Sequence, residues 1–353
     1  MTSPSIAHRT LIAVAAAAAL ASAGCSASNS PAAVHSAPPL ARSASPTPTP
    51  VANLAGPRWY AIAEHGTLQW YDSHTGASLG VSGGPSGYAI TAIGSWHDNR
   101  SIVYAGQPEH SKACRSVLGR QRVDSPTGLT ETTLPHHLVN FAGIVSRLSV
   151  SPDRSKIALV VRAGAECDRV ELVVVDLNTG AQRTWTMPYV ESRPATGGYG
   201  DHYFVDVAEW APDNRHLAVH YAQCCASGGG IWVLDTHRAP GSLLKRLPAL
   251  PKDKPCLQAL PYTWTARGVV ADGNDASCGS QNDALTIVNP TTGESTPLVT
   301  TSIMGAVADV SADPSGQHLL VYGDQTIFRV DNGVVHRLMA LPWDPNSPAM
   351  ATW

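Results

Sequence analysis

Hydrophobic residues along this chain gather in short runs rather than at helical spacing. Runs rich in Val, Ile, Leu and Trp lie at 68–71, 171–175, 231–234, 285–288 and 327–330, and polar or Gly-containing segments separate them. Short apolar runs bounded by turn residues are typical of β-strands. No stretch has the 3.6-residue period of an amphipathic helix. The pattern therefore predicts an all-β fold and disfavours an α/β fold.

One turn sequence follows these runs repeatedly. Asp-Ser-His-Thr-Gly at 72–76 returns in related form at 124–128 and 176–180, and with a leading Asn at 289–293; degenerate copies begin at Asp235 and Asp331. An Asp or Asn side chain caps such a turn, and Gly supplies the positive φ at its exit. Each copy is therefore predicted to close a β-hairpin.

A second turn precedes the first in most repeats. It carries Pro-Asp at 152–153 and 212–213 and Asp-Pro at 313–314, with weaker versions at 96–99 and 265–268. The two turns define a unit of four short antiparallel strands over roughly 50 residues. Six such units predict a six-bladed β-propeller over residues 58–353. A β-sandwich is the alternative, but it would not predict six copies of one pair of turns.

The Pro-Asp turn, the apolar strand after it and the Asp-x-x-Thr-Gly hairpin resemble the WD40-like repeats of TolB-type and related bacterial propellers. The resemblance extends over about residues 58–342. It implies the fold and says little about activity, because propellers host ligand binding, scaffolding and catalysis alike.

The first repeat has only three recognisable strands, at 59–62, 68–71 and 78–81. The chain ends in an apolar, β-capable segment at 349–353. We predict that this segment supplies the missing inner strand and closes the ring, which would hide two open sheet edges. The alternative is a disordered tail.

The N-terminus is typical of an exported protein. Residues 11–20 are apolar but too short to span a bilayer, so residues 1–24 are predicted to be a signal peptide. The Ala-Gly-Cys ending resembles a bacterial lipoprotein signal, in which Cys25 becomes the lipidated first residue; Ser22 departs from the Leu preferred there. Ordinary cleavage nearby, with Cys25 left as a spare thiol, is the alternative.

Residues 25–57 are rich in Pro, Ser, Ala and Thr and lack apolar periodicity, which predicts a disordered tether. We therefore expect a protein exported and lipid-anchored on the outer face of the cytoplasmic membrane of a bacterium, or secreted if Cys25 is not lipidated. The net charge of −3 and the absence of a basic stripe argue against nucleic acid as a partner.

Export changes how the cysteines are interpreted. Six remain besides Cys25, and an even number in an oxidising compartment suggests disulfides. We lettered the strands of each blade a to d from the channel outward. All six then fall in b–c or d–a connections, which emerge on one face, at Cys114, Cys167, Cys224, Cys225, Cys256 and Cys278.

Cys114–Cys167 would link neighbouring blades. Cys256 and Cys278 could pair with each other or each with one of Cys224 and Cys225, and a strained vicinal Cys224–Cys225 bridge is a further option. Pinned long loops are suited to binding, which makes the cysteine-bearing face a candidate working face; the alternative is that the disulfides only protect exported loops against unfolding and proteolysis.

The candidate binding residues form two groups. Tyr199, Asp201 and His202 lie in the Gly-rich connection from the third to the fourth repeat. Arg147 and Asp309 each lie five residues before a turn proline, so they share one column of the inner strands and could meet a ligand or each other in the channel. Asp206 and Glu209 are further inner-strand carboxylates in other registers.

No catalytic signature appears. Cys-x-x-Cys and a Glu-containing zinc signature are absent, no His-x-x-x-His lies on a predicted helix, and the sequence predicts no catalytic residue, metal or cofactor. The leading hypothesis is a monomeric binding or scaffolding module for an extracytoplasmic protein or a glycan, touching the membrane through its lipid anchor only. The alternative is a propeller hydrolase or lyase acting on an extracellular carbohydrate or peptide. It would need acidic residues that converge with His202 or Arg147 in one pocket.

Overall fold

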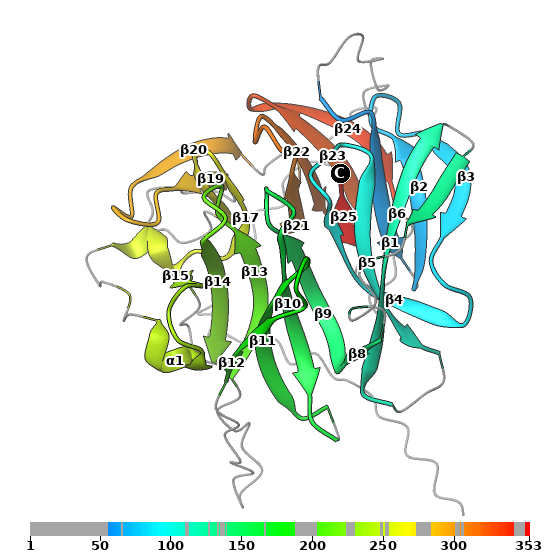
Figure 1. Ribbon diagram of the computed structural model, residues 1–353. Helices are drawn as coiled ribbons and strands as arrows, with labels where there is room; N and C mark the ends of the chain where they lie inside the picture. The colour runs from blue at the N-terminus through cyan, green and yellow to red at the C-terminus, as the bar shows by residue number, and fades with distance from the viewer. Residues whose placement is uncertain are drawn as a thin grey trace, which may run out of the picture. The chain divides into compact units, whose positions relative to one another are not determined.

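The strands form six small sheets arranged around a central channel, as a six-bladed β-propeller (Figure 1). The structure is a computed structural model that describes residues 56–64, 66–109, 113–125, 128–132, 134, 138, 140–165, 167–187, 203–223, 230–247, 250, 254–272, 284–300, 304, 307–341 and 350–353. All of them belong to one compact unit, Thr47–Trp353. The all-β propeller predicted from the sequence is confirmed. No helix in these ranges is long and apolar enough to cross a membrane.

The first three blades follow the chain in order, each described from the channel outward. Blade one contains β25 (Met350–Thr352), β1 (Trp59–Glu64), β2 (Thr67–Asp72) and β3 (Ser78–Gly83). Blade two contains β4 (Tyr88–Ser95), β5 (Ser101–Pro108), β6 (Arg115–Ser125) and β7 (Gly128–Thr132), with β8 (Phe141–Ala142) also paired to β6. Blade three contains β9 (Ile144–Val150), β10 (Lys156–Ala163), β11 (Arg169–Asp176) and β12 (Gln182–Thr186), with β16 (Gly241–Ser242) added outside.

The last three blades complete the ring. Blade four contains β13 (Tyr203–Trp210), β14 (His216–Gln223) and β15 (Ile231–Asp235). Blade five contains β17 (Pro261–Thr265), β18 (Gly268–Asp272), β19 (Ala284–Val288) and β20 (Ser295–Thr300). Blade six contains β21 (Val307–Ala312), β22 (His318–Gly323), β23 (Thr326–Asp331) and β24 (Val334–Ala340). The only helices described are α1 (Leu243–Arg246) and the 3₁₀ helix η2 (Pro255–Gln258).

The repeated turns work as their residue types predict. Asp176 Oδ1 accepts hydrogen bonds from the backbone N–H of Asn178 and Thr179 at 3.0 and 2.8 Å, and Gly180 leaves the turn with φ +75°. Asp72 and Asn289 cap their turns in the same way. Local side-chain capping therefore explains why the same sequence recurs once per blade.

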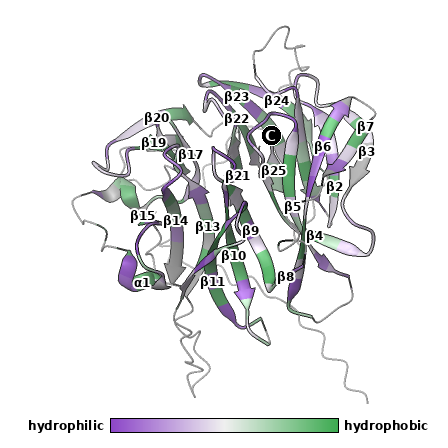
Figure 2. Ribbon diagram, in the orientation of Figure 1, coloured by the Kyte–Doolittle hydropathy of each residue, from purple (hydrophilic) through white to green (hydrophobic). Residues whose placement is uncertain are grey.

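The core lies between blades rather than at one centre. A cluster that includes Leu118, Val145, Ile157 and Val173 joins blades two and three, and similar clusters join the other blades. The strands carry green hydrophobic segments, interspersed with purple hydrophilic ones (Figure 2). Each blade is thus held by the apolar faces of its neighbours.

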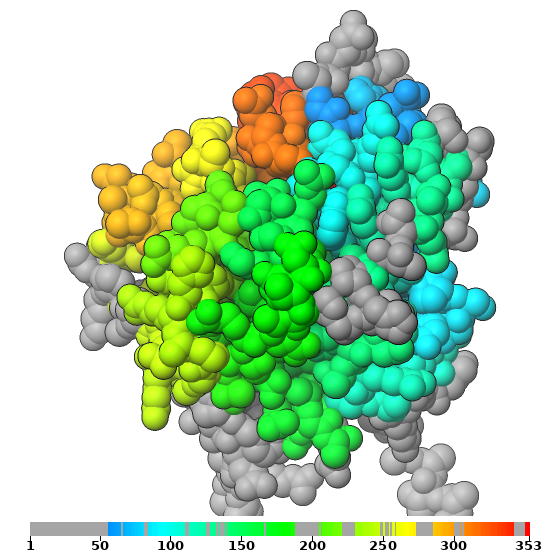
Figure 3. Space-filling view, in the orientation of Figure 1, coloured from blue at the N-terminus to red at the C-terminus, as the bar shows by residue number. Residues whose placement is uncertain are grey.

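The C-terminal strand closes the ring, as predicted. β25 pairs antiparallel with β1, with Ile62 opposite Ala351, so the chain end provides the inner strand of blade one. In Figure 3, surface atoms of the last blade, in orange, adjoin those of the first, in blue. Trp353 is almost fully buried, at 1% exposure, which makes the last residue part of the core.

Blade four departs from the four-stranded prediction. After β15 the chain reaches Pro240, which cannot donate a ladder hydrogen bond, and β16 pairs in parallel with β12 of blade three instead. Leu243 of α1 and Leu247 then pack into the core between blades three and four. The described part of blade four therefore has three antiparallel strands.

Candidate functional site

A β-bulge recurs in the inner strand of five blades. The register shifts at Thr91 in β4, Ser146 in β9, Asp206 in β13, Tyr262 in β17 and Ala308 in β21. Thr91 and Tyr262 each donate a hydrogen bond to the carbonyl that precedes the bulge of the next blade, that of Val145 at 2.7 Å and Val307 at 3.0 Å. A bulge redirects the side chains beside it, and bulges concentrate next to functional sites.

The residue after each bulge occupies the same position in every blade. These residues are Ala92, Arg147, Val207, Thr263 and Asp309. The register thus places Arg147, Val207 and Asp309 in one column, as their spacing from the turn prolines predicted. Arg147 belongs to blade three and Asp309 to blade six, so the two residues come from opposite sides of the ring.

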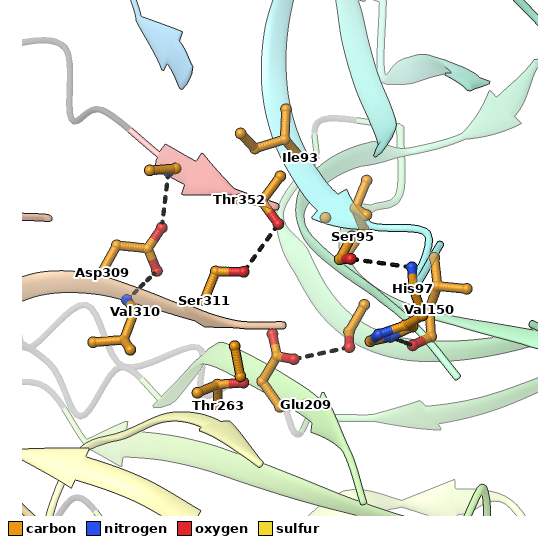
Figure 4. A pocket seen from close by; sticks show the side chains of 15 residues that line it. Ile93, Ser95, His97, Val150, Glu209, Thr263, Asp309, Val310, Ser311 and Thr352 are labelled. Atoms are coloured by element: carbon orange, nitrogen blue, oxygen red, sulfur yellow. Dashed lines mark hydrogen bonds between the residues drawn. The ribbon is translucent and has the colours of Figure 1, made fainter. Parts of the chain in front are cut away.

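A polar cavity of about 60 Å³ lies in the channel and is lined by residues from all six inner strands. A cavity of this size has room for a few waters or one small polar group. Its lining includes Glu209, Thr263 and Asp309 together with Ser149 and Thr352 (Figure 4). Residues on separate blades therefore converge on one space.

The cavity lies toward the a–b turns. β4 contributes Ile93, Gly94 and Ser95 and β9 contributes Leu148 to Val150, which are the last residues of each strand before its a–b turn. The cysteine-bearing connections lie at the other end of the inner strands. Our prediction of the working face thus differs from where this cavity lies. The bulge is in mid-strand, and the polar residues after it occupy the half that leads into the a–b turn.

Glu209 of β13 is the most strongly perturbed acid in the cavity. Ser149 Oγ donates a hydrogen bond to Glu209 Oε2 at 2.9 Å. The pKa of Glu209 is raised to about 8, chiefly by burial and also by the nearby Asp309, although the Ser149 hydrogen bond and Arg147 act in the opposite direction. Its small solvent-exposed area faces the enclosed channel. A carboxyl group with this pKa carries its proton at neutral pH and can release it when a cation approaches.

Asp309 of β21 is the second carboxyl group in the cavity. The backbone N–H of Val310 donates to Asp309 Oδ1 at 3.1 Å, and that of Ala351 on β25 donates to Oδ2 at 3.4 Å (Figure 4). Burial raises the pKa of Asp309, whereas Arg147 and the two backbone donors lower it. Arg147 thus acts electrostatically on both acids.

Two further groups complete the polar lining. The hydroxyl of Thr263 on β17 belongs to a residue with only 7% exposure. His97 follows β4 and its Nε2 lies 2.8 Å from the carbonyl oxygen of Val150; burial lowers the pKa of this imidazole. Within the described ranges, no group of three or more His, Cys, Asp or Glu side chains is arranged to hold a metal ion.

Glu209 was not predicted as a site residue because only the positions five residues before each turn proline were compared. Ser149, Glu209 and Ser311 lie two residues beyond Arg147, Val207 and Asp309, and in a strand such positions share a face. A search for polar residues at both positions would have found Glu209. Thr263 was hidden because the turn of repeat five lacks the proline used as a marker.

The cysteines are only partly described. Cys114 and Cys167 form a disulfide between the b–c connections of blades two and three, which is the bridge that the sequence predicted. The structure differs from the prediction at Cys256, whose thiol is free and buried. Its position on η2 packs it with Ile231 and Val288. Cys25, Cys224, Cys225 and Cys278, together with Tyr199, Asp201 and His202, lie outside the described residues.

Comparison with known proteins gives similarity in structure but not in sequence. No protein-family model matches the chain, and no curated protein matches it. TolB from Acinetobacter baumannii superimposes with a TM-score of 0.51 at 15% identity, over 84% of this chain and 67% of that one. At this identity the likeness shows a shared fold alone, and at that level it supports the TolB-type resemblance.

Two other structures are similar over most of this chain. A putative TolB from Agrobacterium tumefaciens has a TM-score of 0.45 at 11% identity and covers 83% of this chain and 96% of that one. A chain of a nidogen/laminin complex has a TM-score of 0.48 at 12% identity, with 83% and 97% covered.

Proposed function

We propose that this protein is a propeller binding module of the bacterial cell envelope, and that it receives a polar group of an extracytoplasmic protein or glycan in its central channel. The observation that carries the proposal is the convergence of Glu209, Thr263 and Asp309, from three blades, on one cavity, with the charge of Arg147 near enough to act on both acids. Convergent polar groups with perturbed pKa values mark binding or catalytic sites more often than structural ones.

The proposed location rests on the sequence. The signal peptide over 1–24, the lipidation candidate Cys25 and the tether to residue 57 support export and anchoring on the outer face of the cytoplasmic membrane. The Cys114–Cys167 disulfide agrees with an oxidising compartment. Mass spectrometry of the mature N-terminus tests this: a diacylglyceryl-modified Cys25 supports anchoring, and an unmodified N-terminus refutes it.

The binding proposal is tested by narrowing the cavity. Val150→Phe and Ala312→Phe would fill it from blades three and six. Overpacking costs about 1–3 kcal/mol, so each variant is first checked by thermal melting. Folded variants should lose the envelope proteins or glycans that the wild-type protein retains from an envelope extract, whereas Glu294→Gln on an exposed turn should keep them. Equal recovery by wild type and both filled variants would refute a channel site.

A second candidate function follows from the two carboxyl groups, Glu209 and Asp309, that line one cavity. With a pKa of about 8, Glu209 holds a proton that it could give to a leaving group, and Asp309 could assist as a base or stabilising charge. Incubation with envelope glycans should then yield new reducing ends, and Glu209→Gln should abolish them. No turnover by the wild-type protein would exclude this alternative for those substrates.

A further inference from the structure

We propose that the channel cavity recognises a primary ammonium group, which Glu209, Thr263 and Asp309 hold as hydrogen-bond acceptors. This inference rests on the proposed function, because it names the chemical class that the channel would receive. An ammonium group has three N–H donors and no acceptor. Its ideal site is therefore small and lined by acceptors, at least one of them charged.

The three acceptors come from consecutive blades. Glu209 belongs to blade four, Thr263 to blade five and Asp309 to blade six, and all three line the same cavity (Figure 4). Their inner strands run side by side along the channel, so the three acceptors lie next to one another on one part of the channel wall. A donor group with three N–H bonds can address all of them at once.

Thr263 gives an independent indication of a ligand. Its side chain lines the cavity, only 7% of the residue is exposed, and among the described residues its hydroxyl has no hydrogen-bond partner. This hydroxyl is not among the enclosed polar atoms that lack a partner; it is open to the cavity and available to a group placed there. A donor bound in the cavity would supply the missing hydrogen bond.

The charge balance favours a cation over an anion. Two carboxyl groups line the cavity, while Arg147, which acts electrostatically on both, does not line it, so full ionisation leaves an excess of negative charge at the cavity wall. Ser311 and Thr352 are already paired at 3.0 Å. The volume of about 60 Å³ suits a compact ammonium better than a planar guanidinium with five donors.

Displacement of the Glu209 proton by a bound cation gives the inference a measurable dependence on pH. The charged and titratable groups around it are Arg147 from β9 and Asp309 from β21, with His97 lining the same cavity from the turn after β4. Because the pKa of Glu209 is about 8, the bound cation would replace a proton at neutral pH. Affinity should therefore rise with pH up to about 8, by at most about tenfold per pH unit.

The test uses matched small probes and calorimetry on the full exported chain. Nα-acetyl-lysine methylamide presents a side-chain ammonium, alanyl-alanine amide presents a chain-terminal one, and Nα-acetyl-norleucine methylamide lacks the charge. We expect at least one amine to bind, with proton release at pH 7, and the norleucine probe to bind about tenfold more weakly or not at all. The preferred amine distinguishes a lysine side chain from a chain terminus.

Near-isosteric variants assign the acceptors. Glu209→Gln and Asp309→Asn should each weaken amine binding by about tenfold or more, and Thr263→Val should weaken it by a smaller factor. Glu209→Gln should also remove the proton release, while Glu294→Gln should bind as the wild type does. If neither amine binds more tightly than the norleucine probe, or if Asp309→Asn binds the preferred amine as the wild type does, the inference is overturned.

The result separates this inference from the proposed function. If partners are retained in a channel-dependent way but neither amine binds, the binding module stands and the ammonium inference fails. If an amine binds but no envelope component depends on the channel, the ammonium site stands and the proposed envelope partner fails.

Discussion

Two buried charge clusters in this propeller have opposite characters. The seam cluster comprises Arg329, Asp331, His318 and Ser73, and it lies where blade six meets blade one. The channel cluster comprises Arg147, Glu209, Thr263 and Asp309. Both hold one arginine and at least one acid inside the ring, yet only the second borders a cavity.

The seam cluster satisfies its charges internally. Arg329 is fully buried, and its Nε lies 3.0 Å from each oxygen of Asp331. Its Nη1 donates to Ser73 Oγ at 3.0 Å, and its guanidinium lies 5.6 Å from the centre of the Trp353 ring. His318 Nδ1 makes a short hydrogen bond to Asp331 Oδ1. A buried charge pair with this many partners is stable, and it ties the first and last blades together.

The channel cluster contains two acids whose pKa values are shifted from their ordinary range. Burial raises the pKa of both Glu209 and Asp309, and the charge of Arg147 only partly opposes this. Thr263 adds a hydroxyl without a partner among the described residues. The comparison teaches that fully paired buried charges serve closure, whereas incompletely paired ones beside a cavity are available to a ligand.

Removal of residues 346–353 should have the largest effect, because it deletes β25 and buried Trp353 from the seam. Truncation of a buried Trp alone costs about 3–5 kcal/mol, and the deletion should cost more. Urea denaturation measures it, with Trp353→Ala as the smaller step. Unchanged stability would show that the ring does not depend on this closure.

Arg329→Met should cost about 3–5 kcal/mol, because it leaves Asp331 buried without its main cation. Arg337→Met on the exposed face of β24 is the matched control and should change stability by less than about 0.5 kcal/mol. If the two variants unfold at the same urea concentration, the seam cluster is not the structural element that we describe.

Glu209→Gln should change how stability depends on pH. The folded pKa of about 8 lies above the usual value for glutamate, so the unfolded chain loses its proton first and wild-type stability falls as pH rises from about 4.5 to about 8. The variant should lack this contribution, which is on the order of 1 kcal/mol per pH unit. The stability of Glu209→Gln relative to wild type should therefore increase as pH rises across that range.

Urea midpoints at several pH values check this, and Glu294→Gln controls for the loss of one exposed negative charge. A constant difference between Glu209→Gln and wild type would contradict the raised pKa and would make the channel cluster resemble the seam.

Tyr60→Phe should have the smallest effect. The Tyr60 hydroxyl is buried beside the seam and has no hydrogen-bond partner in the described residues, while its ring stacks on Tyr71 at 5.3 Å. Removing the hydroxyl should be neutral or stabilising by up to about 1 kcal/mol. Tyr104→Phe, which loses a hydrogen bond to Glu131, should instead destabilise by about 1 kcal/mol. A loss at Tyr60 that equals the loss at Tyr104 would reveal a hidden partner.

Much of the fold was predictable because its signals are local. Asp176 and Gly180 form their turn from residues next to each other in sequence, so the turn could be recognised directly. The degenerate copies were harder to interpret. In them, Asp235 accepts hydrogen bonds from Arg215, with the shorter at 2.7 Å, and Asp331 pairs with Arg329. Where an arginine side chain holds the aspartate in place, the turn does not need the Thr-Gly that follows the aspartate in the other copies.

The candidate site was predictable only in part. Spacing from the turn prolines found Arg147 and Asp309 because the column repeats with the blades. Glu209 was not assigned to the cavity because it lies two residues beyond the column, and Thr263 was not assigned because the turn of repeat five lacks the proline that marks the column. That both positions line one cavity depends on how the inner strands pack around the channel, which a single strand sequence does not reveal.

The sequence by itself determined the all-β class, the six repeats, the capped turns and the pairing of Cys114 with Cys167, because each depends on near neighbours or on a fixed repeat length. The tertiary structure decided which buried charged groups have hydrogen-bond and ion-pair partners around them. Arg329 and Arg147 are chemically alike, but ring closure surrounds the first with partners and places the second between two acids at a cavity. Only the closed ring sets these distances and this burial, and so separates a structural ion pair from a candidate binding site.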